Sequence, residues 1–407
     1  MSKGNANRSA FYLKYIEWMR YMKKRAMILI LFPLRIIPVK RNLLLMDNSL
    51  SHTYSDSPKA IALELQKRKT QSIKIVLSVL DESKYEDLRK TGIATVKYGS
   101  FRYYCKAVSC AVYLTNSGGY SFLPLRKKQM VINTWHGGGC YKKMGRDKIN
   151  VSKGFDKELV LASKKTTHFL VSCKMFSDVI ERALLIDKSK HLMVGLPRND
   201  ILVNYSSPES QNVRNETRKK IGIEENQKLV LFSPTYRKPK GEPFGRSVST
   251  EYGIDVERIC NALSTRFGGD WIFGYRLHPS IRNEIQVIPE NALDLTLYED
   301  MQELILAADV MINDFSSCMW DFMLTKKPCF TYAVDMDDYI ENTQVYSPVK
   351  DWPFPKAVNN NELEHNILSF NDAQYQAECD RHYKDLGGCE SGNASKTVVD
   401  IIEKHCQ

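Results

Sequence analysis

The sequence lacks the short motifs that identify several common protein classes. No two of its ten cysteines have CxxC spacing, and the nearest pairs are Cys105 with Cys110 and Cys379 with Cys389. With no signal peptide ahead of them, we expect buried or free thiols in a reducing compartment rather than disulfides or a metal site. A Walker loop and a GxGxxG fingerprint are also missing, which disfavours a kinase or a dehydrogenase. Internal repeats and low-complexity tracts are absent as well.

Net positive charge is almost absent outside the first 42 residues. The 407-residue chain has a formal net charge of +11, but residues 1–42 hold ten basic residues and a single acidic residue, Glu17. The other 365 residues therefore carry a net charge of only +2. We do not expect a nucleic-acid-binding surface on a body that is almost neutral. The composition, 43% hydrophobic and 26% charged, is that of an ordinary folded protein of about two domains.

A long uninterrupted apolar run is missing too. The segment "FYLKYIEWMRYMKKRAMILILFPLRIIPV" (residues 11–39) has aromatic and aliphatic residues at helical spacing, but Pro33, Arg35 and Pro38 interrupt its apolar half. It is too short and broken to span a bilayer, and no small-residue cleavage site follows it. We expect a basic amphipathic helix lying on an anionic membrane surface. The alternative is an N-terminal helix packed on the core with its basic face in water.

Short apolar runs alternate with helical patterns along the rest of the chain. Strands are expected within residues 41–49, 72–80, 110–118, 129–137, 167–173, 191–200, 227–238, 271–280, 292–300, 309–317 and 328–334. Helices are expected within residues 57–68, 301–308 and 316–327, the last capped by Ser316 or Ser317. This alternation predicts an α/β protein with parallel sheets and right-handed crossovers, whose ligands bind at the carboxyl ends of the strands.

The apolar pattern lapses over residues 201–220, which we interpret as a link between two domains. The expected organisation is a basic amphipathic membrane-associating segment (1–41), an N-terminal Rossmann-like acceptor domain (42–205) and a C-terminal Rossmann-like donor domain (206–407). The last helix is allowed to cross back to the N-terminal domain. Two such domains facing each other would have the glycosyltransferase type B (GT-B) architecture, an expectation that rests on analogy.

Polar residues gather at the predicted strand ends. They are His136 with Gly137–Gly139, Arg198, Arg237, Arg276, His278 and the helix start at Ser316–Ser317. Arginine forks, imidazoles and helix N-termini all suit a phosphorylated ligand. Each residue alone has a simpler explanation, such as a helix cap, a solvated charge or a structural histidine. Only their repeated occurrence at strand ends favours a site. The acidic run "DMDD" (Asp335, Asp337, Asp338) is interpreted as solvated rather than metal-binding. By analogy with enzymes of the expected fold, no metal or other cofactor is expected.

Several longer segments together resemble a known family. They are "WHGGGCYKKMG", "GLPRND", "LFSPTYR", "YRLHP" and "DVMINDFSSCMWDFMLTKKPCFTYAVDMDDY". The resemblance is to the CDP-glycerol glycerophosphotransferases, which prime or extend teichoic-acid-like polymers. It runs from about Phe32 to Tyr346, and the stretch around Asp314–Asp321 is its most specific part.

The resemblance implies roles for individual residues. His136 would be the general base for the acceptor hydroxyl. His278, the second catalytic residue, would act with Arg276 and Ser316–Ser317 on the donor pyrophosphate and the CMP leaving group. The remaining implied roles are donor positioning by Arg198, Asn199, Thr235 and Arg237, an acceptor loop of Gly137, Gly138, Gly139 and Lys142, and orientation of the helix and basic residues by Asp314 and Asp321.

One motif departs from the family pattern. Many members continue Trp-His-Gly with Thr-Pro-Leu-Lys, whereas this chain has Gly138-Gly139-Cys140-Tyr141-Lys142. The resemblance implies transfer of glycerol phosphate from CDP-glycerol to a lipid-linked glycan or polymer at the cytoplasmic face of a bacterial membrane. Three alternatives remain open at this point: ribitol phosphate from CDP-ribitol, a nucleotide-sugar glycosyltransferase of the same fold, and a non-catalytic membrane- or polyanion-binding protein.

Overall fold

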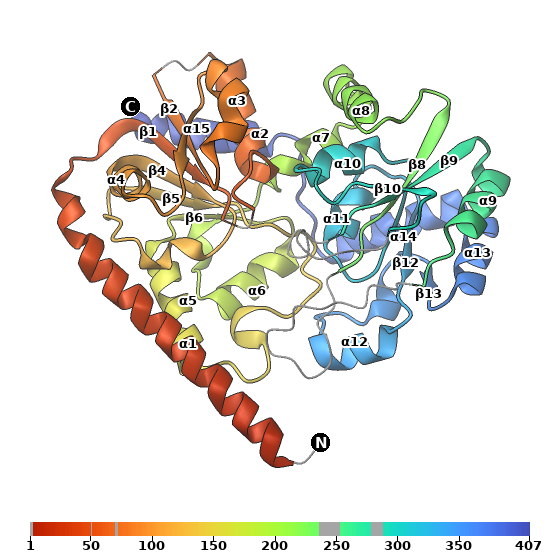
Figure 1. Ribbon diagram of the computed structural model, residues 1–407, viewed down its shortest axis with the longest axis horizontal. Helices are drawn as coiled ribbons and strands as arrows, with labels where there is room; N and C mark the ends of the chain where they lie inside the picture. Colours follow the sequence, from red (N-terminus) through yellow and green to blue (C-terminus); the bar gives the residue numbers. More distant parts are fainter. Residues whose placement is uncertain (1–2, 50, 70–71, 236–252, 278–287) are drawn as a thin grey trace. The chain divides into compact units, whose positions relative to one another are not determined.

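The computed structural model describes residues 3–49, 51–69, 72–235, 253–277 and 288–407 (Figure 1). The chain forms two compact α/β units. The first unit consists of Met1–His136, Met144–Asp200 and Cys389–Gln407, and the second of Gly137–Lys143 and Ile201–Gly388. The chain therefore passes between the units at four points, one of them directly after His136.

The first unit is built on a parallel sheet of seven described strands. Its strands are β1 (Lys40–Asp47), β2 (Lys74–Val79), β3 (Ala94–Lys97), β4 (Cys110–Thr115), β5 (Met130–Asn133), β6 (His168–Leu170) and β7 (His191–Leu192). Their order in the sheet is β3-β2-β1-β4-β5-β6-β7. All six residues of β4 are buried, because helices cover both faces of the sheet and leave no polar side.

The two faces of this sheet have separate cores. Leu44 and Met46 of β1 point to one face, where they join Ile61 of α2 (Asp56–Lys67) and Val398 of α15 (Ala394–Cys406). On the other face Leu43 and Leu45 pack with Tyr103 of α4 (Phe101–Ser109). The other helices of this unit are α1 (Lys3–Leu31), α3 (Glu86–Lys90), α5 (Lys153–Lys165) and α6 (Lys174–Leu184).

The second unit repeats the same strand order. Its strands are β8 (Gln227–Phe232), β9 (Asp270–Tyr275), β10 (Ala292–Asp294), β11 (Val310–Asn313), β12 (Cys329–Tyr332) and β13 (Lys356–Ala357), arranged β10-β9-β8-β11-β12-β13. Its helices are α7 (Asp200–Val203, which begins at the chain crossing), α8 (Pro208–Lys220), α9 (Val256–Phe267), α10 (Met301–Ala307), α11 (Cys318–Met323), α12 (Met336–Thr343), α13 (Asn360–Leu368) and α14 (Asp372–Asp385). Each sheet reverses its strand order once, between β1 and β4 or between β8 and β11, and ligands bind beside such reversals.

The prediction of an α/β fold with parallel sheets is confirmed, and every predicted run contains a strand or helix of the predicted type. Strands β3 and β13, with four and two residues, were not predicted. The units divide after Asp200, five residues before the expected boundary, and Cys389–Gln407 belongs to the first unit. All ten cysteines lie in the described part of the chain and are free thiols.

The N-terminal segment is one helix, α1, followed by a 3-10 turn over Phe32–Ile36. It packs along α5 (Figure 1), where a Cβ on Gly154 would stand only 2.8 Å from the backbone of Glu17. Lys24 pairs with Glu158, and the Lys157 ammonium lies 4.7 Å from the centroid of the Trp18 ring. One side of α1 is therefore docked on the protein, as the packed-helix alternative requires.

Another side of α1 is exposed and apolar. Its exposed residues include Tyr15, Met19, Met22, Leu29 and Ile30, and the last two are 73% and 67% exposed. Exposed cations accompany them on the same helix: Lys14, Arg20, Lys23 and Arg25. Across the described residues, no helix combines the length and the hydropathy needed to cross a bilayer.

Candidate active site

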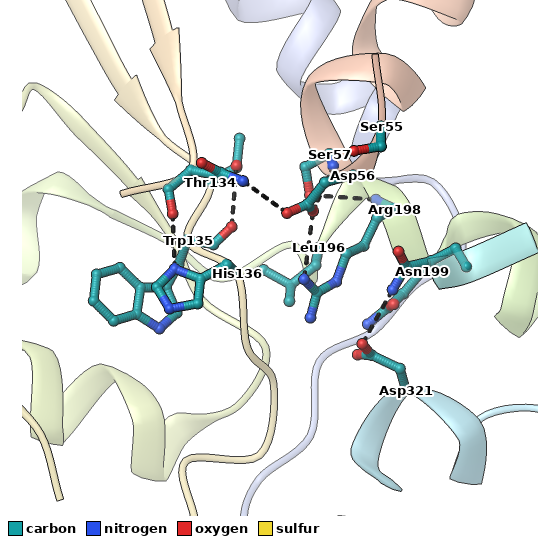
Figure 2. Close-up of polar contacts among 12 residues, drawn as sticks. Ser55, Asp56, Ser57, Thr134, Trp135, His136, Leu196, Arg198, Asn199 and Asp321 are labelled. Carbon is teal, nitrogen blue, oxygen red and sulfur yellow. Dashed lines mark hydrogen bonds and ion pairs between the residues drawn. The ribbon is translucent and has the colours of Figure 1, made fainter. Parts of the chain in front are cut away.

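A cluster of polar residues lies at the carboxyl ends of β1, β4 and β5 in the first unit (Figure 2). Asn48 follows β1, Asn116 follows β4, and the segment Thr134–His136 follows β5. Because these strands are neighbours in the sheet, residues far apart in sequence meet at one edge. This edge includes the reversal of strand order between β1 and β4, where parallel α/β sheets bind ligands.

His136 is held by two contacts. Its Nδ1 lies 2.9 Å from the main-chain oxygen of Asn116, and its ring stacks on Trp135 with centroids 4.4 Å apart. A carbonyl oxygen can only accept, so Nδ1 carries the hydrogen and Nε2 keeps the lone pair. Trp135 has a positive φ of 55° and donates its N–H to Asn133 Oδ1 over 2.9 Å. The ring is thus oriented as a proton acceptor through Nε2.

Asp56 lies between Asn116 and Arg198. Its Oδ2 accepts a 2.9 Å hydrogen bond from Asn116 Nδ2, and its Oδ1 lies 3.4 Å from Arg198 Nη1. The Nδ2 group of Asn116 also donates to Asn48 Oδ1 over 2.6 Å. Because Asn116 is only 1% exposed and both neighbours of Nδ2 are acceptors, its amide orientation is fixed by its partners. Figure 2 shows His136, Asp56 and Arg198 on this one edge of the sheet.

These surroundings shift the protonation of His136. Burial lowers the pKa of the imidazole below its ordinary value of 6.5, because the charged form loses solvation. The hydrogen bond to Asn116 and the negative charge of Asp56 act in the opposite direction, while Arg198 lowers the pKa further. The net effect is a neutral imidazole at neutral pH, which is the form that can take a proton.

Arg198 and Asn199 follow the last strand of this sheet. Arg198 is only 6% exposed and contacts Asp56, while Asn199 Nδ2 donates to Glu390 Oε1 over 2.9 Å. Glu390 Oε2 also accepts from the Leu196 N–H over 2.8 Å. Asn199 is therefore part of the attachment of residues 389–407 to the first unit. A donor contact by either residue stays a prediction.

The segment Gly137–Lys143 belongs to the second unit. A Cβ on Gly138 would stand 2.1 Å from Trp320 Cδ1, and Gly139, with φ +68°, packs against the same indole. Tyr141 is buried beside Trp352 and its hydroxyl lies 3.1 Å from His382 Nε2. Gly138 and Gly139, both expected in an acceptor loop, are buried under this aromatic cover, and Gly137 is half-buried. A contact between these glycines and the acceptor stays a prediction. Close packing thus explains two of the three glycines.

A second polar cluster lies at the reversal point of the other sheet. Thr235, after β8, donates its N–H over 2.9 Å and its hydroxyl over 2.6 Å to the carboxylate of Asp314, which follows β11. The Lys142 ammonium lies 3.5 Å from Thr235 Oγ1 and 5.4 Å from the centroid of the Tyr339 ring. Lys142, expected in an acceptor loop, is therefore placed beside a residue expected to bind the donor.

The other described residues predicted to act at the donor site lie on α11 and in the loops that follow β9 and β11. Arg276 is buried after β9 and donates to the main-chain oxygens of Leu277 and Tyr298 over 3.0 and 3.2 Å. Ser316 and Ser317 are half-buried before α11, which has only six residues. Asp321 is buried on that helix and accepts from Gln302 Nε2 over 3.1 Å. Two predicted residues, Arg237 and His278, lie outside the described residues.

Sequence interpretation missed three residues that shape these clusters: Asp56, Asn116 and Trp320. Asp56 has a positive φ of 62° at the start of α2, which a linear pattern does not show. Asn116 could have been found, because it directly follows a buried strand, as His136 follows the Asn133 end of β5. Within the described ranges, no group of three or more His, Cys, Asp or Glu side chains is arranged to hold a metal ion.

Comparison with known proteins gives a consistent family. The family model described as CDP-glycerol:poly(glycerophosphate) glycerophosphotransferase matches residues 30–404. A teichoic acid poly(glycerol phosphate) polymerase of Staphylococcus epidermidis is 26% identical over 90% of this chain and 51% of its own length. A teichoic acid glycerol-phosphate transferase of Staphylococcus aureus is 24% identical over 89% of this chain and 93% of its own length. The teichoic acid ribitol-phosphate polymerase TarL of the same organism is 24% identical over 67% of this chain and 48% of its own.

The chain thus spans about half the length of the first curated relatives it matches. Among solved structures, the wall teichoic acid polymerase TagF, in a crystal soaked with CDPG, superposes with a TM-score of 0.79 and 23% identity. That match covers 97% of this chain and 98% of the other. It shows that the two proteins share a fold.

Proposed function

Because this chain belongs to the CDP-glycerol:poly(glycerophosphate) glycerophosphotransferase family, we propose that it transfers glycerol phosphate from CDP-glycerol to a hydroxyl group of an acceptor and releases CMP. The acceptor is a lipid-linked glycan or a growing teichoic-acid-like polymer. One observation carries the proposal beyond the family assignment: His136 stands at a strand-end edge with Nδ1 bonded to Asn116 and Nε2 left as a base.

The proposed chemistry is a single displacement at phosphorus. The acceptor oxygen attacks the β-phosphorus of the donor and forms a new O–P bond. The bond between that phosphorus and the bridging oxygen breaks, and its electron pair leaves with CMP. The hydroxyl proton passes to Nε2 of His136, a step that a positioned base accelerates by about 10²–10⁴-fold. Stabilising the departing charge is then the main task of the donor site.

The donor site of this proposal lies at the reversal of strand order in the second sheet. Thr235, Arg276, Ser316 and Ser317 come from loops that follow β8, β9 and β11. The proximity of its ammonium to Thr235 leads us to add Lys142 to this set as a cation for the donor phosphates. Arg198, Asn199, Arg237 and His278 keep their proposed roles in donor binding and catalysis. A GT-B arrangement of the two units is part of the same proposal.

We also propose that α1 attaches the enzyme to the cytoplasmic face of the membrane as a peripheral protein. The support is the exposed apolar side of α1, with Met22, Leu29 and Ile30, beside exposed Lys14, Arg20 and Lys23. Apolar groups that enter the interface and cations that meet anionic headgroups are the two requirements for such binding. An acceptor carried on a lipid would then be held close to the enzyme.

A ribitol-phosphate transferase is the second candidate. It is supported by relatives named as ribitol-phosphate polymerases, whose identity of 24% is close to that of the glycerol-phosphate relatives. Glycerol and ribitol differ only in the polyol beyond the transferred phosphate, so the base and the leaving group are the same. Polyol choice is therefore tested directly rather than inferred from the site.

The test is an assay of CMP release and label transfer. The protein is incubated with lipid-linked acceptor and radiolabelled CDP-glycerol, CDP-ribitol or UDP-sugars in parallel. We expect label from CDP-glycerol to reach the lipid, and His136→Ala to abolish both signals while the fold is kept. His365→Ala is the matched control, because His365 is exposed on α13. Transfer of sugar alone, or undiminished CMP release by His136→Ala, contradicts the proposal.

A further inference from the structure

The carboxylate of Asp56 is connected to His136 through one intervening residue. Asp56 Oδ2 accepts from the side chain of Asn116, and the main-chain oxygen of Asn116 accepts from Nδ1 of His136. Each link is 2.9 Å long. Asn116 is also tied to Asn48 at the end of β1, so it cannot turn without breaking several contacts. The three residues come from the loops after β4 and β5 and from the start of α2.

Asp56 adopts a backbone conformation that costs energy. Its φ of +62° is in the left-handed region, which costs a non-glycine residue on the order of 1 kcal/mol. The N-cap position of α2 is Ser55, so Asp56 is not the capping residue, although its Oδ1 accepts from the adjacent Ser57 N–H over 2.6 Å. Strain of this kind persists where the surrounding structure enforces it, often at functional sites. In Asp56 this backbone conformation directs Oδ2 of the carboxylate toward the side chain of Asn116.

We infer that Asp56 is a positioning residue for His136. Through Asn116 it fixes the orientation of the imidazole, and its negative charge stabilises the imidazolium that forms as the acceptor hydroxyl loses its proton. This inference rests on the proposed role of His136 as a base. It assigns a function to a residue that sequence patterns did not identify, and it gives Arg198 a second role as the counter-charge of Asp56 over 3.4 Å.

Charge balance at the imidazole makes the inference specific. Among the described residues, Asp56 from α2 and Arg198 from the turn after β7 are the charged groups that act on His136, and they act in opposite directions. The negative charge of Asp56 raises the pKa of His136, while the positive charge of Arg198 lowers it. Removing either charge must therefore move the imidazole titration with a known sign.

The experiment measures the His136 titration without any substrate. Histidine-labelled protein is titrated by NMR, and the signal of His136 is assigned among the eight histidines by its loss in His136→Gln. We expect Asp56→Asn to lower the pKa of His136 by about one unit and Arg198→Gln to raise it by a similar amount. Asparagine tolerates positive φ, so the first variant should fold. Asp81→Asn, an exposed acid after β2, is the matched control and should leave the titration unchanged.

Kinetics then test the positioning role. In Asp56→Asn we expect kcat/KM for CMP release to fall about a hundredfold, since small misplacements of a catalytic group cost this much. The acidic limb of the pH profile should move to lower pH with it. Asn116→Ala keeps the main-chain oxygen and the charge of Asp56, so His136 should titrate as in the unmodified protein while kcat/KM falls about tenfold.

An unchanged or raised His136 pKa in Asp56→Asn overturns the inference, as does full activity of Asn116→Ala. These results are separable from failure of the proposed function. If the unmodified protein releases no CMP from any CDP-polyol, the proposed function is wrong, whereas the imidazole titration still decides whether Asp56 controls His136.

Discussion

Gly138 lies directly against the indole of Trp320, so that a Cβ at position 138 would stand 2.1 Å from Cδ1 of that ring. Real Cβ atoms do not approach other heavy atoms so closely, and the rigid indole has little room to move. Trp320 is fully buried and stacks on Tyr383 with centroids 5.4 Å apart. The loop after His136 therefore packs against Trp320 in the second unit only because residue 138 is a glycine and has no side chain.

The first prediction follows from that contact. Gly138→Ala should destabilise the protein by about 1–3 kcal/mol, the usual cost of overpacking, as measured by denaturant unfolding followed by tryptophan fluorescence. Gly118→Ala is the control, because a Cβ there meets nothing within 4 Å and φ is −84°. Trp320→Phe should recover part of the loss when combined with Gly138→Ala. Equal unfolding midpoints for Gly138→Ala and the control would show that the loop accommodates the added methyl group without loss of stability.

A second prediction concerns Asp314. Its buried carboxylate accepts from both the N–H and the hydroxyl of Thr235 and also from the Phe315 N–H. Asp314→Ala leaves these donors without their acceptor, which costs about 1–3 kcal/mol for each buried group. We expect a lower unfolding midpoint together with a KM for CDP-glycerol raised about tenfold or more. Asp372→Asn, whose side chain is 65% exposed, should change neither quantity.

The third prediction is the pH dependence of kcat/KM. His136 must be neutral to accept a proton, and burial lowers its pKa below 6.5. Activity should therefore stay level from neutral pH down past 6.5 and fall only as the pH passes through the lowered pKa. The measurement is the initial rate of CMP release at low donor concentration across the acid range. If kcat/KM fell to half its plateau value at pH 6.5 or above, the result would contradict the environment found for this imidazole.

A fourth prediction concerns α1. Replacing Lys14, Arg20 and Lys23 by Gln removes three exposed charges, each worth about 1 kcal/mol near an anionic surface. Binding to vesicles that contain anionic lipid should weaken about a hundredfold in a sedimentation assay, and binding to neutral vesicles should change little. The control replaces exposed Lys84, Lys90 and Lys174 by Gln, away from α1. Equal weakening in both triple variants would argue against α1 as the attachment surface.

The strands could be predicted because burial on both faces leaves a simple pattern. In β4 and β5 every residue is buried, so the chain shows a plain apolar run that ends at the sheet edge. His136 could be proposed for the same reason, since it follows such a run. The edge strand β13 gave no such signal, because it has two residues and one of them is a half-buried lysine.

The surroundings of His136 could not be predicted from the sequence. Asp56, Asn116 and His136 meet because β1 lies between β2 and β4, and β4 beside β5, an order that the linear sequence does not state. The direction in which Asp56 points depends on a positive φ that is unusual for aspartate. Likewise, the burial of Gly138 under Trp320 pairs residues that are distant in sequence, so the sequence did not predict this contact.

The return of residues 389–407 to the first unit has a consequence for folding of the nascent chain. Val398, Val399 and Ile402 of α15 fill the core over Leu44 and Ile61, and α15 lies along α2 (Figure 1). A ribosome makes this helix only after the whole of the second unit. Until then, the aliphatic side chains on one face of the first sheet are uncovered, and a chaperone would bind the nascent chain there. Deletion of α15 would leave the same apolar face exposed in the finished protein.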